Sequence, residues 1–381
     1  MDKQLIGHTH RLGILGGGQL GRMLIQEAIS YDIHVHIMEN QDDAPSSKIA
    51  TSFTKGDITN YDDVMAFGKD MDVLTVEIEN VNIDALYDLE KQGVKVYPQP
   101  RVLEIIKDKG TQKEFYAKNG IPTSDFELFA ENPNMEELAD KIPFVHKLRT
   151  GGYDGKGVQI IRSEEDLKNC FTDPSLAEVL VPFEKELSVI VARNERGQTA
   201  TYPTVECEFN EANLVAYLFS PADVSKEIEE KATEVAIDVI NKLEMVGILA
   251  VELFLTKEGD ILVNEVAPRP HNSGHHTIEC NTTSQFEQHM RSVMNMPLGA
   301  TRMIQAGAML NLIGSEGYTG DAVYEGMDSI LEYPGVHPHI YGKTTTKPYR
   351  KMGHITVSAP TIEEAKSIAG KIKDRVRVIA S

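Results

Sequence analysis

Short apolar runs alternate with helix-like spacing over the first hundred residues of the chain. The predicted strands cover residues 12–15, 33–38, 73–78 and 94–97, and the predicted helices cover 20–29 and 84–91. Alternating strands and helices are typical of a parallel sheet with helices on both faces. Pro98 and Pro100 interrupt the pattern, so we expect a domain boundary near residue 105.

After residue 105 the pattern mixes helices with hairpins. Helices are expected over 110–119, 228–243 and 363–373, and strands over 142–145, 158–161, 247–255, 260–266 and 376–380. We therefore divide the chain into an N-terminal segment (1–105), a central segment (106–297) and a C-terminal segment (298–381). The expected fold class is α/β in the first segment and α+β in the other two.

The charge balance narrows the range of partners. The 381 residues include 38 Lys and Arg against 58 Asp and Glu, a net charge of −20. Nucleic acid and anionic membrane surfaces repel such a chain, so we expect neither as a partner. The chain has no apolar run of 18 residues and does not begin like a secretion signal. Cys170, Cys207 and Cys280 match no zinc-site spacing, which predicts buried thiols in a cytoplasmic protein.

The first of two glycine-rich motifs lies between a predicted strand and a predicted helix. Gly16, Gly18 and Gly21 form a G-x-G-x-x-G pattern, which can present N–H groups to a phosphate. Glu39 ends the second predicted strand, where a dinucleotide enzyme could hold a ribose. The motif fits a nicotinamide or flavin cofactor, another phosphate ligand or a purely structural turn.

The second glycine-rich motif, residues 147–157, lies between two predicted strands. Its four glycines predict a flexible turn whose N–H groups can cover a polyphosphate, while Lys147 and Lys156 supply charge. It is not a Walker A loop, because Lys156 is followed by glycine and then by a strand. The alternative is an ordinary glycine-rich hairpin, which would not need so many basic residues.

Two glutamates are expected to face each other in the hairpin formed by 247–255 and 260–266. If the turn is centred on residues 258–259, Lys257 faces Asp260 and Glu252 faces Glu265. Facing carboxylates repel each other unless a cation lies between them, and magnesium prefers oxygen ligands. The alternative is a solvated acidic face. An apolar frame favours the metal, and its expected members on the same face are Ala250, Phe254, Ile261 and Val263.

Two later segments concentrate chemical groups. Residues 267–276 gather arginine, histidine and amide side chains directly after Glu265, in a loop that two prolines stiffen. Zinc is the rival ligand there, although no cysteine or acidic partner completes a tetrahedral site. Residues 341–354 contain the densest basic cluster, which is either a solvated loop or a pocket for a substrate phosphate. Its members are Lys343, Lys347, Arg350 and Lys351.

These features together favour an enzyme that uses ATP and magnesium with an anionic second substrate. A dinucleotide oxidoreductase needs neither a second polyphosphate loop nor an acidic metal pair.

Several motifs, in order over nearly the whole chain, resemble one ATP-grasp family, the 5-(carboxyamino)imidazole ribonucleotide synthetases. They are G-G-G-Q-L-G-R-M at 16–23, T-V-E-I-E-N-V at 75–81, R-T-G-G-Y-D-G-K-G at 149–157, N-E-V-A-P-R-P-H-N-S-G-H at 264–275, Y-G-K at 341–343 and R-K-M-G-H at 350–354. The resemblance implies a Rossmann-like first domain, an ATP-grasp domain with a lid at about 115–183 and a small C-terminal domain, usually in a homodimer. It implies that ATP, bicarbonate and 5-aminoimidazole ribonucleotide give the N-carboxylated ribonucleotide, ADP and phosphate through carboxyphosphate, a step of purine synthesis.

The resemblance also implies roles for individual residues. Implied ATP contacts are Lys109, Lys147, Gly152, Tyr153, Asp154, Gly155, Lys156, Gly157, Glu178, Val179, Leu180, Val181, Glu186, Asn264 and Glu265. Implied contacts to the ribonucleotide or bicarbonate are Gln19, Leu20, Glu77, Tyr153, Asp154, Arg269, His271, Asn272, Ser273, Lys343, Arg350 and Lys351. Arg269 and His271 are the implied catalytic residues, and Glu252 and Glu265 the implied magnesium ligands. Asn264 would point away from the glutamates in a regular strand, so its role requires a twist or a bulge.

The chain departs from the family pattern at two places. Lys109 stands where relatives often have arginine, and the stretch before Phe209 lacks the histidine that many relatives carry. The nearest alternative activity is that of the ATP-grasp, formate-dependent glycinamide ribonucleotide transformylases, against which the segments H-N-S-G-H and R-K-M-G-H argue. A non-catalytic nucleotide-binding paralogue is the alternative outside enzymes.

Overall fold

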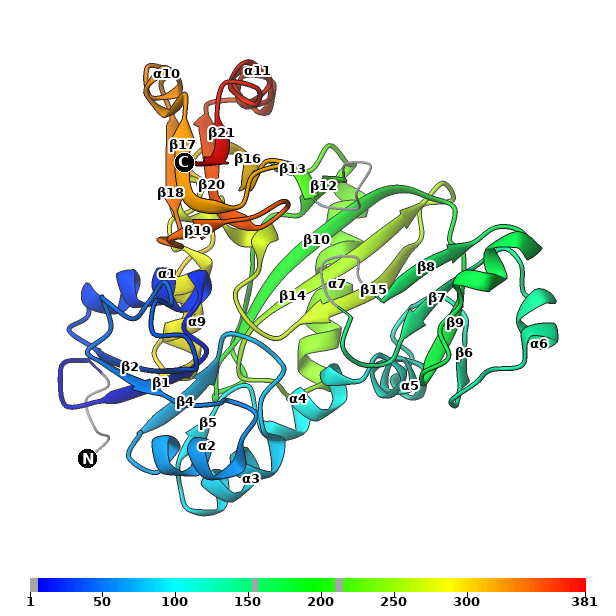
Figure 1. Cartoon of the computed structure of the whole chain (residues 1–381), viewed down its shortest axis with the longest axis horizontal. Coiled ribbons are helices and arrows are strands. Elements are labelled where there is room, and N and C mark those ends of the chain that lie inside the picture. The colour runs from blue at the N-terminus through cyan, green and yellow to red at the C-terminus, as the bar shows by residue number, and fades with distance from the viewer. Residues whose placement is uncertain (1–5, 153–156, 210–214) are drawn as a thin grey trace.

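The N-terminal segment folds around a five-stranded parallel sheet. In the computed structural model of the chain, which describes residues 6–152, 157–209 and 215–381, the strand order is β3-β2-β1-β4-β5 (Figure 1). The strands are β1 (Arg11–Leu15), β2 (His34–Glu39), β3 (Ser52–Lys55), β4 (Val73–Val76) and β5 (Lys95–Val96), and the helices are α1 (Gln19–Ile29), α2 (Tyr61–Gly68), α3 (Ile83–Lys91) and α4 (Pro100–Lys107). One face of the sheet packs on α1, and the other face packs on α2 and α3. The predicted parallel sheet with helices on both faces is confirmed.

Three elements of this segment, β3, α2 and α4, were not predicted, and for β3 and α4 the physical reason is clear. Strand β3 is an edge strand with exposed residues at three of its four positions, so it shows no apolar run. Pro100 was interpreted as an interruption, but it begins α4, where the missing N–H of proline would have no helical partner anyway.

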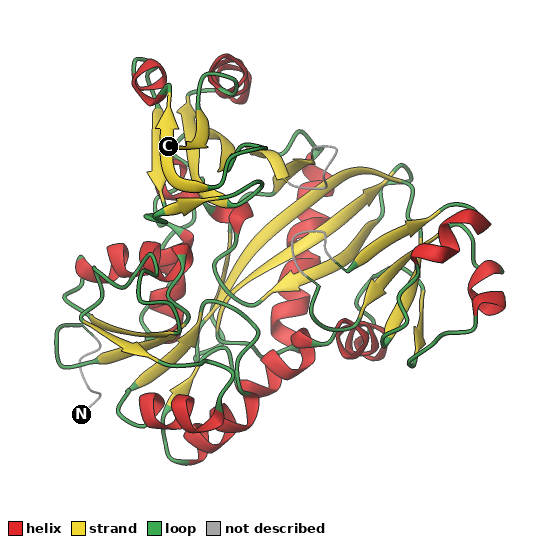
Figure 2. Cartoon of the chain, in the orientation of Figure 1, coloured by secondary structure: helices red, strands yellow, loops and turns green. Residues whose placement is uncertain are grey.

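A nine-stranded sheet runs through the central and C-terminal segments (Figure 2). Its strands are β10 (Phe183–Arg193), β11 (Thr199–Thr201), β12 (Val205–Phe209), β13 (Val215–Ser220), β14 (Gly247–Thr256), β15 (Ile261–Ala267), β16 (Ala306–Ile313), β18 (Val336–Ile340) and β20 (Lys351–Ala359). Helix α7 (Lys226–Lys242) covers one face of β10, β14 and β15 and forms the largest core with them. Because β13 pairs with β16, the C-terminal segment continues the central sheet.

The central segment also contains a smaller, four-stranded antiparallel sheet with the order β6-β9-β7-β8. Its strands are β6 (Phe126–Phe129), β7 (Phe144–Leu148), β8 (Val158–Ile161) and β9 (Ser175–Val179), flanked by α5 (Lys109–Asn119), α6 (Met135–Ala139) and the 3₁₀ turn η1 (Glu164–Asn169). The pairing of β7 with β8 confirms the predicted strand-turn-strand arrangement around the second glycine-rich motif.

The remaining elements lie at the end of the central segment, where α9 packs against the core of the N-terminal segment, and in the C-terminal segment. They are η2 (Asn272–Gly274), α8 (Thr277–Cys280), α9 (Gln285–Val293), β17 (Gly320–Glu325), α10 (Met327–Leu331), β19 (Thr345–Thr346), α11 (Ile362–Ile372) and β21 (Arg377–Ala380). The predicted helices at 110–119, 228–243 and 363–373 are confirmed as α5, α7 and α11. Every helix in the described part of the chain is too short or too polar to cross a membrane.

Candidate active site

Glu252 on β14 and Glu265 on β15 face each other, which confirms the predicted pair. The ladder shifts register next to Glu252, and Asn264 is the extra residue of the resulting β-bulge. The bulge gives the Asn264 side chain access to the site, where its Oδ1 accepts a hydrogen bond from Lys147 Nζ at 2.9 Å. The bulge that the implied role of Asn264 required is therefore present.

The turn of this hairpin differs from the prediction. The Thr256 N–H donates to the Asp260 carbonyl at 3.0 Å, and Leu255 pairs with Ile261. Lys257 therefore does not face Asp260, and the pairing is displaced by one residue until the bulge corrects it. The prediction that Ile261 and Val263 share the glutamate face is therefore wrong. Both side chains pack in the core against α7 instead.

The two facing glutamates are half-buried and lie in different charge environments. The Lys109 ammonium pairs with Glu265 and lowers the pKa of that carboxyl despite its burial. Burial, with the neighbouring charges of Glu265 and Glu186, raises the pKa of Glu252. The raised pKa of Glu252 beside the lowered pKa of Glu265 indicates that Lys109 compensates the charge of Glu265 but not that of Glu252.

The donor set fits magnesium better than zinc. Facing carboxylates are hard oxygen donors, and magnesium is usually held by one or two carboxylates plus substrate phosphates. In residues 6–152, 157–209 and 215–381, no group of three or more His, Cys, Asp or Glu forms a metal site. A structural zinc site would require four such ligands from the protein.

Glu178 is buried and bound by two lysines. Lys147 Nζ lies 3.1 Å from its Oε1, Lys113 Nζ lies 3.2 Å from its Oε2, and Ser124 Oγ donates to it at 2.9 Å. The side chain is thus engaged within the protein, and the backbone of Glu178 belongs to β9, which pairs with β6 on one side and with β7 on the other. Lys113 was not predicted, because it lies on α5 with no motif around it.

An apolar surface adjoins the segment that follows β9. Val179 is exposed, and Phe183 stacks on Phe254 with ring centroids 4.8 Å apart. Glu186, three residues after Phe183, is half-buried, and burial raises its pKa to about 7. Leu180 and Val181 are half-buried between β9 and β10. Phe254 was expected in the apolar frame of the glutamates, but its stacking with Phe183 was not predicted, because the two rings come from distant parts of the sequence.

The second glycine-rich motif is anchored at its start. The Arg149 guanidinium pairs with Asp108, which also caps α5, and the Lys109 N–H donates to the Arg149 carbonyl at 2.8 Å. Gly151 and Gly157 have φ values of +80° and +76°, a region that favours glycine. Gly152 is the last described residue before a gap, since the predicted Tyr153, Asp154, Gly155 and Lys156 lie outside the described residues.

The first glycine-rich motif is occupied by the protein's own carboxylates. The Gly17 N–H donates to Glu39 at 3.1 Å and the Gly21 N–H donates to Glu77 at 3.0 Å. Burial raises the pKa of Glu77 to about 7. A phosphate would have to displace both carboxylates, so this geometry argues against a dinucleotide at the motif.

The implied contacts of Gln19 and Leu20 differ in accessibility. Gln19 is half-buried at the start of α1, whereas the Leu20 side chain is buried in the core of the N-terminal segment. Only the backbone of Leu20 is therefore available to a ligand.

The 267–276 loop connects the hairpin to the N-terminal segment. Arg269 Nε lies 2.9 Å from Glu79, two residues beyond Glu77. His271 Nε2 lies 3.5 Å from Glu252 Oε1, and its Nδ1 accepts from the Ser273 N–H. This arrangement places the proton of a neutral His271 on Nε2, directed toward Glu252.

A buried glutamine holds this loop in place. Gln285 Oε1 accepts from the His271 N–H at 2.9 Å, and its Nε2 donates to the His271 carbonyl at 2.8 Å. Ser273 is fixed by Ser188 Oγ at 2.8 Å, while both polar atoms of the Asn272 side chain are buried without a partner among the described residues. The Asn272 side chain therefore has polar atoms that a ligand could satisfy.

The basic cluster of the C-terminal segment lies near α1. Lys343 Nζ donates to the Lys351 carbonyl, and the Arg350 guanidinium donates to the Thr345 carbonyl, both at 2.7 Å. A Cβ on Gly342 would lie 3.4 Å from the Arg22 guanidinium. Arg22 thus adds a cation that we had not predicted, although it belongs to the first glycine-rich motif.

A stack of histidines joins the basic cluster to the 267–276 loop. The rings of His275 and His354 are 4.7 Å apart, and those of His354 and His339 are 4.4 Å apart. His354 Nδ1 lies 3.0 Å from the Tyr341 hydroxyl, and burial keeps the pKa values of His275 and His354 well below the usual range. The rings of His275 and His354 are therefore neutral, and the stack connects the two groups of implied ribonucleotide contacts.

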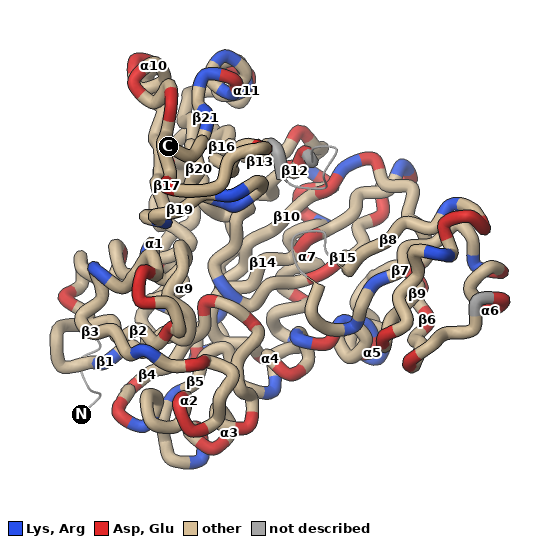
Figure 3. Tube along the Cα trace, in the orientation of Figure 1, with Lys and Arg blue, Asp and Glu red and all other residues tan. Residues whose placement is uncertain are grey.

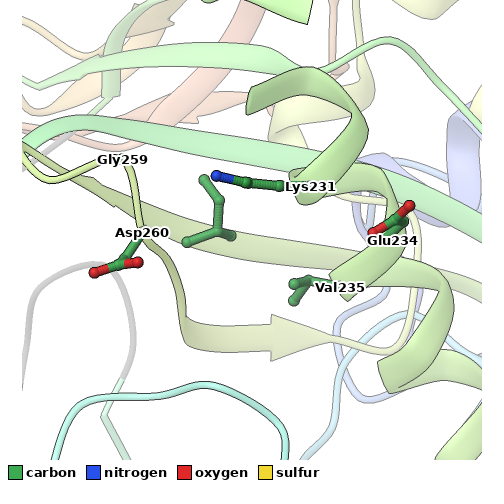
Figure 4. A pocket seen from close by; sticks show the side chains of 6 residues that line it. Lys231, Glu234, Val235, Gly259 and Asp260 are labelled. Carbon is green, nitrogen blue, oxygen red and sulfur yellow. The ribbon is translucent and has the colours of Figure 1, made fainter. Parts of the chain in front are cut away.

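A shallow pocket of about 200 Å³ lies on the opposite face of the β14–β15 hairpin, against α7 (Figure 4). Its lining residues are Lys231, Glu234, Val235, Gly259, Asp260 and Ile261. None of them is an implied site residue. The acidic residues are spread over all three segments rather than gathered at this pocket (Figure 3).

The free cysteines differ from the prediction in burial. Cys280 is buried, but Cys170 and Cys207 are only half-buried.

Known families match the chain in three consecutive parts. The ribonucleotide synthetase preATP-grasp domain matches residues 9–107, the ATP-grasp domain matches 114–286, and the phosphoribosylaminoimidazole carboxylase C-terminal domain matches 307–368. These matches confirm the expected fold class and the resemblance on which it rested.

Individual relatives agree with the family matches. The chain is 35% identical to the N5-carboxyaminoimidazole ribonucleotide synthase of Bacillus subtilis, covering 98% of each chain. The structure of the corresponding synthetase from Thermotoga maritima has a TM-score of 0.91 and 40% identity, covering 98% of this chain and all of that one. An Aspergillus clavatus structure in complex with ADP and 5-aminoimidazole ribonucleotide has a TM-score of 0.89 and 33% identity, covering 97% of this chain and 99% of that one.

Other relatives are longer than this chain. It spans 65–68% of fungal and plant proteins named phosphoribosylaminoimidazole carboxylase. With nearly complete mutual coverage of the Bacillus subtilis synthase, the chain belongs to the N5-carboxyaminoimidazole ribonucleotide synthase family of ATP-grasp ligases.

Proposed function

We propose that this protein uses ATP to carboxylate 5-aminoimidazole ribonucleotide with bicarbonate, releasing ADP and phosphate. The observation that carries the proposal is the contact of His271 with Glu252 at 3.5 Å. It joins the hairpin that faces the implied ATP site to the loop that faces the implied ribonucleotide site. A phosphorylated intermediate formed on one side can therefore meet the amine on the other without leaving the protein.

On the ATP side, the protein supplies position and positive charge. We propose that Lys109, Lys147 and the second glycine-rich motif bind the phosphates, with adenine against Val179 and the Phe183–Phe254 pair. A bicarbonate oxygen attacks the γ-phosphorus, the bond to the β–γ bridging oxygen breaks, and carboxyphosphate and ADP form. Lysine ammonium groups stabilise the charge that develops on the transferred phosphoryl group.

Glu252 and Glu265 would hold magnesium, assisted by the phosphates of the nucleotide. When bound, the cation would neutralise charge on the β- and γ-phosphates. The raised pKa of Glu252 supports this role, because a cation beside it would remove the repulsion from Glu265 and Glu186.

On the ribonucleotide side, we propose that Glu77, Gln19 and the Leu20 backbone hold the aminoimidazole ribonucleotide, while Lys343, Arg350 and Lys351 bind its phosphate. Arg269, Asn272 and Ser273 would surround the carbon that is transferred. The proton on His271 Nε2 suits it to donate a hydrogen bond to a carboxylate oxygen. The exocyclic amine then attacks the carbon of carboxyphosphate, loses a proton and displaces phosphate.

We further propose that 1–105 binds the ribonucleotide, that 106–297 binds ATP, and that 298–381 completes the phosphate pocket, in a cytoplasmic homodimer. Membership of the family supports this assignment. The alternative transformylase activity is less compatible with a C-terminal segment that matches the carboxylase C-terminal domain.

The test is ADP release by the purified chain with each substrate omitted in turn. We expect release to require 5-aminoimidazole ribonucleotide and bicarbonate together and to stop when EDTA removes magnesium. Equal release with glycinamide ribonucleotide and formate would support the transformylase instead. ADP binding without any turnover would indicate the non-catalytic paralogue.

A further inference from the structure

Lys113 is a buried cation that the proposed reaction does not use. Its side chain is 2% exposed, and its Nζ donates to Thr123 Oγ1 at 2.6 Å and Ser124 Oγ at 3.0 Å. Its third partner is Glu178 Oε2 at 3.2 Å. A lysine is rarely buried to this extent unless its charge is paired, so the contact with Glu178 is central to its placement.

Lys113 shares Glu178 with Lys147. Lys147 Nζ lies 3.1 Å from Glu178 Oε1 and 3.2 Å from Oε2, the oxygen that Lys113 also contacts, and it donates to Asn264 at 2.9 Å. Two ammonium groups therefore share one carboxylate, and the group carries an excess of one positive charge. Lys113 is 2% exposed and Lys147 is 9% exposed, so that excess is available at Lys147, the member that contacts the β14–β15 hairpin through Asn264.

We infer that Lys113 is a positioning residue of the proposed ATP site. Because Lys113 shares Glu178 with Lys147, the single negative charge of this carboxylate cannot neutralise both ammonium groups, so that Lys147 remains available to a phosphate. The inference rests on the proposed function only in taking Lys147 as a nucleotide contact. It does not depend on which second substrate is carboxylated.

The competing explanation is that Lys113 serves stability alone. Thr123 Oγ1 also donates to the Val263 carbonyl at 2.6 Å, so Lys113 helps to fix the segment after α5 against β15. Removing it would then lower the melting temperature without a specific effect on nucleotide affinity. A variant series can separate the two explanations, because the positioning role acts only through Glu178.

The test compares Lys113→Met, Glu178→Gln and the double variant in the full chain. Calorimetry measures the affinity for ADP in the presence of magnesium. We expect Lys113→Met to weaken ADP binding about tenfold, because Glu178 then pairs with Lys147 alone. The double variant should bind ADP within about threefold of Glu178→Gln, because the competing carboxylate is gone. Lys118→Met, an exposed site on the same helix, is the matched control and should match the unmodified chain.

Two results would overturn the inference. One is Lys113→Met with unchanged ADP affinity, and the other is a double variant that binds ADP about tenfold more weakly than Glu178→Gln. If Lys113→Met fails to fold, the comparison of the double variant with Glu178→Gln still decides the question. Since ADP binding is measured without turnover, a failed carboxylation assay would leave this result interpretable.

Discussion

The two glycine-rich motifs have similar composition and opposite surroundings. In the first, carboxylates of Glu39 and Glu77 accept hydrogen bonds from the loop N–H groups. In the second, two basic residues precede the glycines: Lys147, and Arg149, which pairs with Asp108. A carboxylate on the loop repels a phosphate, whereas an ammonium group attracts it. The difference teaches that the charged side chains beside such a loop, and not its glycines, determine what the loop binds.

The largest change in catalytic efficiency should come from adding a side chain to the first glycine-rich motif. A Cβ at Gly18 would lie 2.1 Å from Glu77 Oε1, while the φ of −78° accepts alanine. Gly18→Ala should displace the Glu77 carboxylate and lower kcat/KM for 5-aminoimidazole ribonucleotide by about 100-fold, with ADP affinity within twofold. Steady-state kinetics and calorimetry measure the two quantities.

Gly370→Ala is the control for this change, because a Cβ there meets nothing within 4 Å. If Gly18→Ala weakened ADP binding and left the ribonucleotide kinetics intact, the assignment of the two motifs would be reversed.

The next effect comes from the basic side of the second motif. Lys147→Met removes the cation that contacts Glu178 and Asn264, and ADP binding should weaken about 30-fold. The KM for 5-aminoimidazole ribonucleotide should change little. A large rise in that KM with normal ADP affinity would place Lys147 in the other half of the site.

A smaller, pH-dependent effect should belong to the first motif alone. Burial raises the pKa of Glu77 to about 7, so this carboxyl is protonated below that pH and ionised above it. If the ionised form accepts hydrogen bonds from the ribonucleotide, kcat/KM for this substrate should rise with pH and level off above about 7. Glu77→Gln should remove the step, whereas the pH profile of ADP affinity should not contain it. A step that survives in Glu77→Gln would belong to another group.

The smallest effect, a change in melting temperature, is expected at the first glycine of the second motif. Gly151 has a φ of +80°, and a Cβ there would meet nothing within 4 Å. Gly151→Ala should therefore cost only backbone strain, about 1 kcal/mol, and lower the melting temperature by about 2 °C. A thermal melt checks the prediction. A loss of several degrees would mean that the loop is packed more tightly than its surroundings indicate.

Local patterns predicted elements, and long-range contacts determined what those elements do. The pairing of Glu252 with Glu265 was predicted from a turn placed one residue away from its actual position, and the bulge at Asn264 compensated for the error. A bulge has no signature in the apolar pattern, so the inward positions of Ile261 and Val263 could not be predicted.

Partners that come from distant elements were also beyond prediction. Glu178 was implied as part of the adenine hinge, but its carboxylate binds Lys113 and Lys147 from two other elements. Likewise, the contact of Glu77 with the first glycine-rich motif depends on β4 lying beside β1, which the sequence pattern alone does not specify.

The most direct test of the account is a crystal structure of the full chain with ADP, magnesium and 5-aminoimidazole ribonucleotide. We expect the ADP phosphates at Lys147 and the second glycine-rich motif, with magnesium about 2.1 Å from oxygens of Glu252 and Glu265. The ribonucleotide should lie between Glu77 and Arg269, with its phosphate at Lys343 and Lys351. ADP phosphates on the N–H groups of Gly17 and Gly21, with Glu39 and Glu77 displaced, would contradict the central claim.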